Sequence, residues 1–574
     1  MSDLSIYHRV CCAFARTRSG DLLCCTGRLE DAIRNHWDLI RSSVAPTAAH
    51  QPLLSPDENK YAGLPRTSPS PSSTNKSLIK VDEIQDEELA LYESQERSDG
   101  DTIFGIILQQ PHTVGADFDD VFVSLLLKSI KLFTSPPPSL VSDIDSELKD
   151  TTDAIVDLFD ARLRYVSAED KWTSHGREYF SGRVHEFVRR RERIEFCLPA
   201  FPCKSSSVEK VFGTMPDRGE QLALEHLHSF VEAIEGIYEP GAKLWIISDG
   251  HVFSDCIGVD DEMVDRYNAQ LISMNATISQ RRGGTDRVGF KSLVVLFNLE
   301  HSMAEIEHIP LPALQSYIST QRTPAAELSR QMLVQGCRTR EGILRSRIKS
   351  GSHSALKLYC GFSRFMLEDL KLNRYTKHLS RSKLKKLGSK VAFEMIQRNE
   401  AYSNLVELLF PYHVRLSIHA HDNAGPKFGI RLFGPEVRAL ETLSFDAAEM
   451  TTFDLLHVPT PWHNCLVEVT GHPTLFMVKS KAVRDALSSG KFNGGWVDGS
   501  HQGVAGHFRL QLANPRSDID YRAKSVAGNR GGRWDSHANV YYDDLEKEYP
   551  YMSTAAVDMD IIHGRAALSD ISSH

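Results

Sequence analysis

Short apolar segments alternate with amphipathic ones through the middle of the chain, and this alternation restricts the possible folds more than any other feature. The predicted strands are Ile194–Phe201, Lys243–Ser248 and Lys291–Asn298, and the predicted helices are Gly219–Ile237 and Val259–Arg281. Strands that read as continuous apolar runs are buried on both faces, as in parallel sheets covered by helices. The sequence therefore predicts an α/β fold with a Rossmann-like, mostly parallel sheet flanked by helices, a helical segment, and a C-terminal mixed or antiparallel β part.

Changes in composition divide the rest of the 574 residues. Residues 1–100 are predicted to form an N-terminal extension that contains a Pro/Ser-rich disordered linker at about 41–80. The expected Rossmann-like domain covers residues 101–323, the helical segment 324–402, the β-rich part 403–515 and a tail 516–574.

Bulk composition argues against several classes of protein. A net charge of -9 argues against general nucleic-acid binding. The sequence has no uninterrupted apolar run of about 18 residues, the length that a membrane span needs. The N-terminus lacks an apolar region followed by a small-residue cleavage site, and the cysteines include no CxxC pair. We therefore expect a cytoplasmic protein that binds neither nucleic acid nor a membrane, and make no prediction of its oligomeric state.

Two strand patterns flank a dense turn signal between residues 411 and 433. Tyr412–Ile418 alternates apolar and polar residues, Asp422–Pro426 combines Asp, Asn, Gly and Pro, and Phe428–Phe433 resumes the extended pattern. This arrangement predicts a β-hairpin.

The polar positions of the predicted hairpin are candidates for a site. Arg415, Ser417 and His419 are two residues apart, so their side chains leave the same face of one strand. Lys427 begins the return strand. Two cations, a hydroxyl and an imidazole favour an anionic substrate and proton transfer. The same pattern is typical of a strand with one solvent-exposed face, and this alternative stays open.

Polar side chains also follow two of the predicted parallel strands. Lys204 and Ser205 come just after the first strand, and Asp249 directly after the second. Ligands of open α/β sheets bind beyond the carboxyl ends of strands. Lys204 is therefore a candidate for binding a phosphate or carboxylate, and Asp249 for binding an amine or moving a proton. The alternatives are an ordinary loop and a carboxylate that caps the next turn.

Two further segments carry candidate chemistry. The prolines of Pro459–Asn464 fix a loop that presents Trp462 and His463, which suits either a general acid or base or a buried structural histidine. We interpret the basic stretch Lys371–Lys390 as a solvated face in preference to a cationic lid over a phosphate.

Cofactor motifs are missing from the sequence. It contains no GxxxxGKS or GxxxxGKT, no strand-linked GxGxxG and no GxSxG. His419 and His421 form an HxH pair, but no partner cluster with a recognisable metal-ligand spacing accompanies them. We therefore expect neither a cofactor nor a metal.

Four motifs occur in a fixed order along the chain. They are FPCKSS with MPDRGEQLALEHL, LWIISDGHVFSDCIGVDDEMVDRYNAQL, RNEAYSNLVELLFPYHVRLSIHAHDNAGPKFGIRL and TPWHNCLVEV. Together they resemble the isocyanide synthase family, which is also called the pyoverdine/dityrosine biosynthesis family. The resemblance covers about residues 170–515, and the N-terminal extension with its linker is more typical of a fungal member.

This resemblance implies an enzyme of secondary metabolism. Members of the family convert the α-amine of an amino acid to an isonitrile, with ribulose 5-phosphate as co-substrate and one-carbon donor and without nicotinamide. Relatives in fungal spore-wall pathways form an N-formyl amino acid instead. A non-catalytic member that has kept the fold, and an iron-dependent oxygenase that uses His419 and His421, are the remaining alternatives.

The residue types fit this implied chemistry, which needs fixed cations for anionic groups and several acids and bases. The expected substrate-binding residues are Lys204, Ser205, Arg398, Arg415, Ser417 and Lys427. Among these, Arg415 and Lys427 are expected to bind an anionic group, with Lys204 assisting. The expected catalytic residues are His419 and His463, as general acids or bases, and Asp249, which would hold the substrate ammonium or orient a base.

Overall fold

The structure is a computed structural model of the chain. It describes Leu125, residues 142–513 except 168–169, 307, 338–340, 352, 411, 420 and 444–458, and the segments 532–535 and 540–543. The predicted extension 1–100, with its linker at about 41–80, and most of the tail 516–574 therefore lie outside the described residues. Among the described helices, none is both long enough and apolar enough to cross a membrane.

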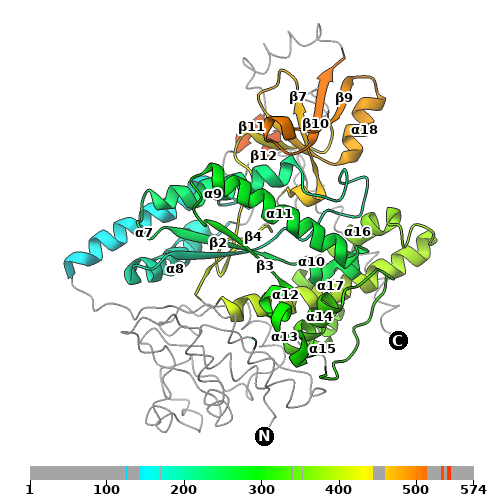
Figure 1. Ribbon diagram of the computed structural model, residues 1–574, viewed down its shortest axis with the longest axis horizontal. Helices are drawn as coiled ribbons and strands as arrows, with labels where there is room; N and C mark the ends of the chain where they lie inside the picture. The colour runs from blue at the N-terminus through cyan, green and yellow to red at the C-terminus, as the bar shows by residue number, and fades with distance from the viewer. Residues whose placement is uncertain are drawn as a thin grey trace.

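A five-stranded parallel sheet forms the centre of the protein (Figure 1). Its strands, in spatial order, are β3 Val288–Ser292, β2 Ala242–Ser248, β1 Ile194–Pro199, β4 Val414–Ser417 and β5 Lys427–Gly429. Every neighbouring pair in this sheet is parallel. The predicted α/β class with a mostly parallel sheet is confirmed.

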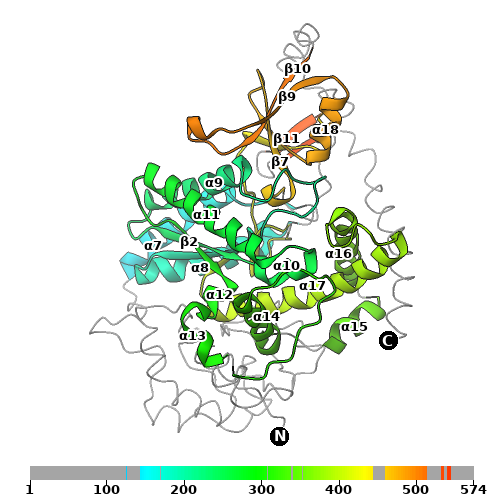
Figure 2. The same cartoon turned by 45° about the vertical axis from the view of Figure 1, so that its right-hand side comes forward.

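Helices cover both faces of the sheet because its strands carry apolar side chains on both sides (Figure 2). Phe196 and Leu244 face one layer, which contains α7 Ser142–Arg162, α8 Arg177–Arg190, α9 Arg218–Glu235 and α11 Asp261–Arg281. Cys197 and Ile247 face the other layer, which contains α10 Gly250–Ile257, α12 Leu293–Leu296, α13 Leu299–Ile306, α14 Pro324–Cys337, α16 His353–Leu372 and α17 Arg381–Leu409. Each large apolar side chain buried in these layers contributes about 1.5–3 kcal/mol. Helix α15 Glu341–Lys349 packs beside α16.

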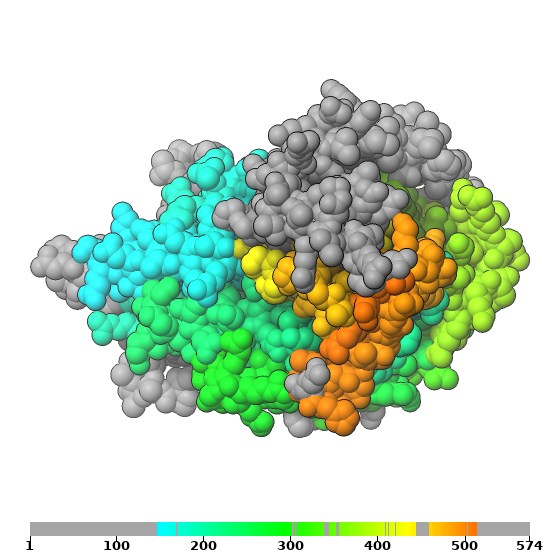
Figure 3. Space-filling view, turned by 90° about the horizontal axis from the view of Figure 1, so that it is seen from above, coloured from blue at the N-terminus to red at the C-terminus, as the bar shows by residue number. Residues whose placement is uncertain are grey.

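A second, mixed sheet lies beside the α/β layers. Its strands, in spatial order, are β6 Val437–Ala439, β8 Leu475–Val478, β7 Cys465–Val469, β10 His507–Leu512 and β9 Phe492–Val497. Helix α18 Ser480–Ser488 packs on it, and β11 Gly532–Asp535 pairs with β12 Val540–Asp543 in a separate antiparallel ribbon. Seen from above, segments of this sheet (orange) lie against green segments of the α/β part (Figure 3). Arg281 of α11 donates to the Gly503 carbonyl at 3.0 Å.

The predicted β-hairpin at residues 411–433 is wrong, because β4 and β5 are parallel. Residues 418–426 return the chain to the end of the sheet at which β4 began. Asn423 holds this return: its Nδ2 donates to the Tyr165 carbonyl at 2.7 Å and its Oδ1 accepts the Gly429 N–H at 2.8 Å. Alternation of polar and apolar residues identifies a strand but says nothing about the direction of its neighbour. As a result, β4 and β5 complete the first sheet although they lie beyond residue 402.

The predicted strand Lys291–Asn298 is wrong over most of its length. Strand β3 ends at Ser292, whose hydroxyl accepts the Val295 N–H and caps α12. A short apolar run does not distinguish a buried strand from a buried helix, and here the capping residue inside the run selects the helix.

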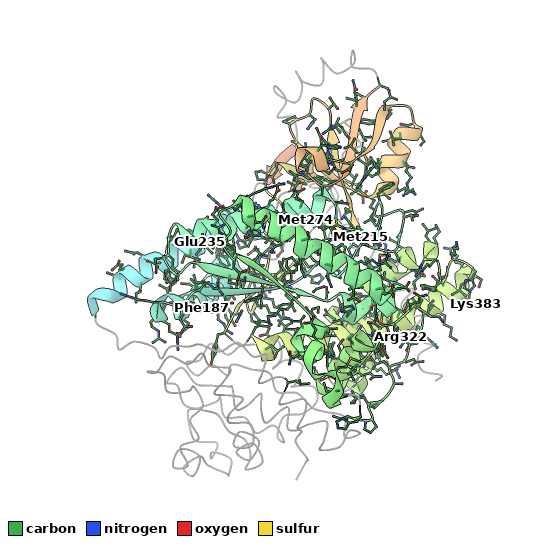
Figure 4. The ribbon with its side chains drawn as sticks, in the orientation of Figure 1. Phe187, Met215, Glu235, Met274, Arg322 and Lys383 are labelled. Atoms are coloured by element: carbon green, nitrogen blue, oxygen red, sulfur yellow. The ribbon has the colours of Figure 1, made fainter. Side chains whose placement is uncertain are left out.

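The basic stretch Lys371–Lys390 contains the end of α16 and the start of α17. Lys383 is exposed and lies at the outer edge of the molecule (Figure 4). A helix rises about 1.5 Å per residue, which places Lys383 roughly 30 Å from Ser403 further along α17. This arrangement agrees with a solvated face.

Candidate active site

The order of strands in the first sheet reverses between β1 and β4. The chain moves outward from β1 to β3 and then returns to the other side of β1 with β4. Ligands of open α/β sheets bind outside the carboxyl ends of the strands at such a switch point. The Ser248 hydroxyl donates to the Phe201 carbonyl at 3.1 Å and ties the ends of β2 and β1 together. We therefore take this edge of the sheet as the candidate active site.

Asp249 directly follows β2 at this edge. Its Oδ1 atom is buried and has no hydrogen-bond partner among the residues that the structure describes. Burial raises the pKa of its carboxyl from the ordinary 3.8 to about 7, because desolvation disfavours the charged form. Both protonation states are present near neutral pH, so Asp249 can accept and donate a proton.

Arg415 and Lys427 form a pair of cations on the face of the sheet that α17 covers. They are adjacent in register on β4 and β5. Arg415 Nη2 and Lys427 Nζ both donate to the Ser403 hydroxyl of α17, at 3.0 and 2.8 Å. The two predicted cations are therefore held together by a helix that the sequence pattern did not connect with them.

Two more charged residues lie near this pair: Glu407 of α17, which contacts Arg415, and Arg183 of α8, whose charge acts on Glu407. We define Arg183, Arg415, Lys427 and Glu407 as the cationic cluster. Glu407 of α17 accepts a hydrogen bond from Arg415. Burial alone would raise the pKa of the Glu407 carboxyl, but Arg415, Lys427 and Arg183 lower it below its ordinary value. Burial lowers the pKa of Arg183 to about 10, and Glu407 opposes that shift. The guanidinium therefore remains charged at neutral pH.

Two histidines lie beside the cationic cluster. His421 Nε2 is 3.0 Å from the Ser417 hydroxyl, and the backbone N–H of His419 donates to the same hydroxyl at 3.2 Å. Burial, followed by the charges of Lys427 and Arg415, lowers the pKa of His421 to about 4, so this imidazole is neutral at pH 7. In the described part of the chain, no three His, Cys, Asp or Glu side chains are grouped to hold a metal ion.

Tyr402 of α17 connects Asp249 with the cationic cluster. Its hydroxyl donates to the Ile247 carbonyl of β2 at 2.7 Å. Burial and then the charge of Asp249 raise the pKa of Tyr402, while Arg415 opposes them. Asp249 and Arg415 therefore both lie near this tyrosine. The candidate site has a carboxyl on its β2 side and cations on its β4 and β5 side.

Lys204 is engaged inside the protein. Its fully buried Nζ lies 2.8 Å from Asp217 and 2.9 Å from Glu220, and it donates to the Pro461 carbonyl at 2.8 Å. Asp217 and Glu220 form the capping box that begins α9. The Lys204 ammonium thus joins three segments of the fold, and its contacts give it a structural role. Its predicted role in binding a substrate anion stays a prediction.

Replacing Lys204 with methionine is expected to destabilise the protein by about 3–5 kcal/mol, because two carboxylates would remain buried without their cation. Denaturation in urea measures this change. Lys383→Met, at an exposed position of α17, is the control and should change the free energy of unfolding by less than about 0.5 kcal/mol. A Lys204→Met variant as stable as this control would contradict the structural role.

Ser205 belongs to a second buried polar group, next to Asp249. Its hydroxyl donates to Asp369 Oδ1 of α16 at 2.9 Å, and Lys210 Nζ lies 2.9 Å from the same carboxylate. Burial raises the pKa of the Cys203 thiol, and the charges of Asp249 and Asp369 raise it further. Cys203 therefore lies near both carboxyl groups. Ser205 contacts protein atoms here, and its predicted contact with substrate stays a prediction.

His463 lies near the loop that carries Cys203 and Ser205, at the end of the short helix η3 Pro461–His463. Its ring packs edge-on against Phe365 of α16, with 5.0 Å between ring centroids. The neighbouring Trp462 packs on Phe201 at 4.9 Å. The structure thus places His463 beside the loop after β1, whereas His419 lies beside the cationic cluster. The two predicted acid–base histidines belong to different parts of the candidate site.

Arg398 joins α17 to α10. It is buried and donates to both oxygens of Asp255, at 2.5 and 3.1 Å, to Glu394 at 2.8 Å and to the Val252 carbonyl at 3.0 Å. These contacts involve both ends of the guanidinium. They indicate that Arg398 fixes the helix that carries Tyr402, and its predicted contact with substrate stays a prediction.

Residues of α17 are the main part of the site that sequence reasoning missed. Ser403 and Glu407 are four residues apart, so they share one face of the helix, and both lie within the motif RNEAYSNLVE. That spacing was a usable signal for a polar helix face directed at the sheet. Arg183 had no such signal, because it is one of several arginines on α8.

The fold and site define a doubly wound α/β protein whose switch point carries a cationic cluster and a carboxyl group with a pKa near neutrality. Residues 184–490 match the family model described as "Pyoverdine/dityrosine biosynthesis protein". The chain therefore belongs to the pyoverdine/dityrosine biosynthesis protein family, which confirms the resemblance in its motifs.

Several curated proteins are similar to this chain. The spore wall maturation protein DIT1 of Saccharomyces cerevisiae is 43% identical over 69% of this chain and 73% of its own length. The L-tryptophan isonitrile synthase AmbI2 of Fischerella ambigua is 34% identical, over 50% of this chain and 71% of its own. The L-tyrosine isonitrile synthase of Xenorhabdus nematophila is 32% identical, over 60% of this chain and 86% of its own length. A crystal structure of PvcA from Pseudomonas aeruginosa aligns with a TM-score of 0.48 and 25% identity, covering 63% of this chain and 99% of that one.

Proposed function

We propose that this protein is an isonitrile (isocyanide) synthase that converts the α-amine of an amino acid to an isonitrile, with ribulose 5-phosphate as co-substrate and carbon donor. The observation that carries the proposal is the division of the site, with Asp249 on one side and the cationic cluster on the other. This division suits an amine and a phosphate that must be held apart but close. Similarity to tryptophan and tyrosine isonitrile synthases supports the reaction class.

In this proposal the cations bind the anionic groups of the substrates. Arg415 and Lys427 donate to phosphate oxygens, and the planar guanidinium can make two parallel contacts. The buried position of Arg415, 7% exposed, strengthens such contacts because little water screens them.

Asp249 moves protons in the first step. The substrate ammonium must lose a proton before its nitrogen attacks the ketone of the sugar phosphate, and the resulting imine forms with release of water. An ionised Asp249 accepts that proton, and the protonated acid returns it to the departing hydroxyl. A carboxyl with a pKa of about 7 can do both at neutral pH. His419 is the proposed second acid or base on the side of the cationic cluster.

A second candidate is the formation of an N-formyl amino acid. This product differs from the isonitrile by one molecule of water. The 43% identity to a spore wall maturation protein is the reason for keeping this candidate beside the first. For either reaction we propose the cytoplasm as the compartment, because Cys203, Cys256 and Cys465 are buried thiols, which a reducing environment preserves.

The purified protein, incubated with ribulose 5-phosphate and one of tyrosine, tryptophan or valine, is expected to release a product that has gained one carbon and lost two hydrogens. Mass spectrometry with uniformly 13C-labelled ribulose 5-phosphate should show one labelled carbon in the product, and omission of the sugar phosphate should abolish it. A product that carries one more water selects the N-formyl candidate. No product from any proteinogenic amino acid contradicts both.

A further inference from the structure

Glu407 places a carboxylate against the cations that are proposed to bind substrate. We propose that Glu407 is an internal counter-ion of this anion site: its carboxylate competes with a bound anion for the cationic cluster and thereby sets the affinity for the phosphate-bearing substrate. The inference rests on the proposed function for the identity of that substrate, but the competition applies to any small anion.

The geometry brings Glu407 and the cations onto one common surface. Ser403 and Glu407 are one turn apart on α17, and both contact Arg415. Lys427 donates to the Ser403 hydroxyl at 2.8 Å. An anion that accepts hydrogen bonds from Arg415 and Lys427 must therefore lie within a few ångströms of the Glu407 carboxylate.

Charge makes this proximity unfavourable for a bound anion. The cationic cluster consists of three cations and one carboxylate, so these four groups carry a net charge of about +2 when ionised. The Glu407 side chain is 17% exposed and Arg183 is 9% exposed, so water screens the repulsion between Glu407 and an incoming phosphate only partly. Removal of the carboxylate charge would leave the same cations with a net charge of about +3.

Arg415 does not depend on Glu407 alone for its position. Its Nη1 also donates to the Ser403 carbonyl at 3.2 Å, and its Nη2 donates to the Ser403 hydroxyl at 3.0 Å. A purely structural role and a competing role therefore predict opposite results when the carboxylate is neutralised. A residue that only positions Arg415 would weaken anion binding on removal, whereas a competitor would strengthen it.

The test is the substitution Glu407→Gln, which keeps the size of the side chain and removes its charge. Titration calorimetry with inorganic phosphate at pH 7 should give a Kd about tenfold or more lower than that of the wild type. The KM for ribulose 5-phosphate should fall in the same direction. Glu232→Gln is the matched control, because Glu232 pairs with Arg282 at 2.6 Å on the other helical layer, and its Kd for phosphate should equal that of the wild type.

Unchanged or weaker phosphate binding in Glu407→Gln overturns the inference, as does the absence of phosphate binding in both proteins. If Glu407→Gln does not fold, Glu407→Met, which has a similar length and no charge, takes its place with the same expectation. Tighter phosphate binding without formation of an isonitrile or N-formyl product supports the counter-ion and contradicts the proposed function. Product formation without tighter phosphate binding supports the proposed function and contradicts the counter-ion.

Discussion

Replacing Asp249 with asparagine is expected to lower kcat of the proposed reaction by at least about 100-fold. The asparagine amide has nearly the same shape as the carboxyl group but can neither accept nor return the proton of the substrate ammonium. In the wild type, the ionised form is the base, so kcat/KM should rise with pH through about 7, the pKa to which burial raises Asp249. Rate measurements between about pH 5 and 9 should lose this limb in Asp249→Asn.

The same substitution is expected to stabilise the protein at pH 8. The folded state holds the Asp249 proton up to about pH 7, whereas the unfolded chain releases it near 3.8, so folding stability falls as the pH rises between these values. Removal of the ionisable group recovers at most about 4 kcal/mol, and less to the extent that the partly exposed residue is solvated. Asp150→Asn, on the exposed side of α7, is the control for both measurements. An Asp249→Asn variant that keeps its activity contradicts this role of Asp249. So does a variant that loses as much stability between pH 4 and pH 8 as the wild type does.

Replacing Arg415 with alanine is expected to lower kcat/KM for ribulose 5-phosphate by about 100- to 1,000-fold, because a buried, charge-assisted contact to an anion is lost. Arg415→Lys should recover only part of this loss. One ammonium cannot reproduce the planar contacts that the guanidinium makes with Ser403 and could make with a phosphate. Steady-state kinetics with each substrate varied in turn measures the effect.

The KM values for the two substrates also show which anionic group Arg415 binds. A KM increase for ribulose 5-phosphate alone assigns Arg415 to the phosphate, whereas an increase for the amino acid alone assigns it to the carboxylate. Arg282→Ala removes a guanidinium that pairs with Glu232 far from the switch point and should leave both constants unchanged. If Arg415→Ala is as active as Arg282→Ala, the cationic cluster is not the anion site.

Much of the fold could be predicted from local patterns. Continuous apolar runs identified β1 and β2, and amphipathic patterns identified α9 and α11, close to their observed ends. A strand covered on both faces is apolar along its length, and side-chain direction repeats every 3.6 residues in a helix. The same patterns predicted that Asp249 follows a strand and that Arg415 and Lys427 are on strands. They could not distinguish a buried helix from a buried strand after Ser292.

The amino-acid order thus specified the elements, the polar residues at their ends and, through four motifs, the family. The folded arrangement decided which of those polar residues meet. Lys204 donates to the Pro461 carbonyl, which is 257 residues away in the sequence, and Ser205 donates to Asp369, which is 164 residues away. Such partners, like the parallel pairing of β4 with β5 and the placement of Glu407 against Arg415, depend on how whole elements pack. Hydrophobic burial drives that packing, and it is a non-directional force. A local sequence pattern therefore does not specify which elements pack against each other.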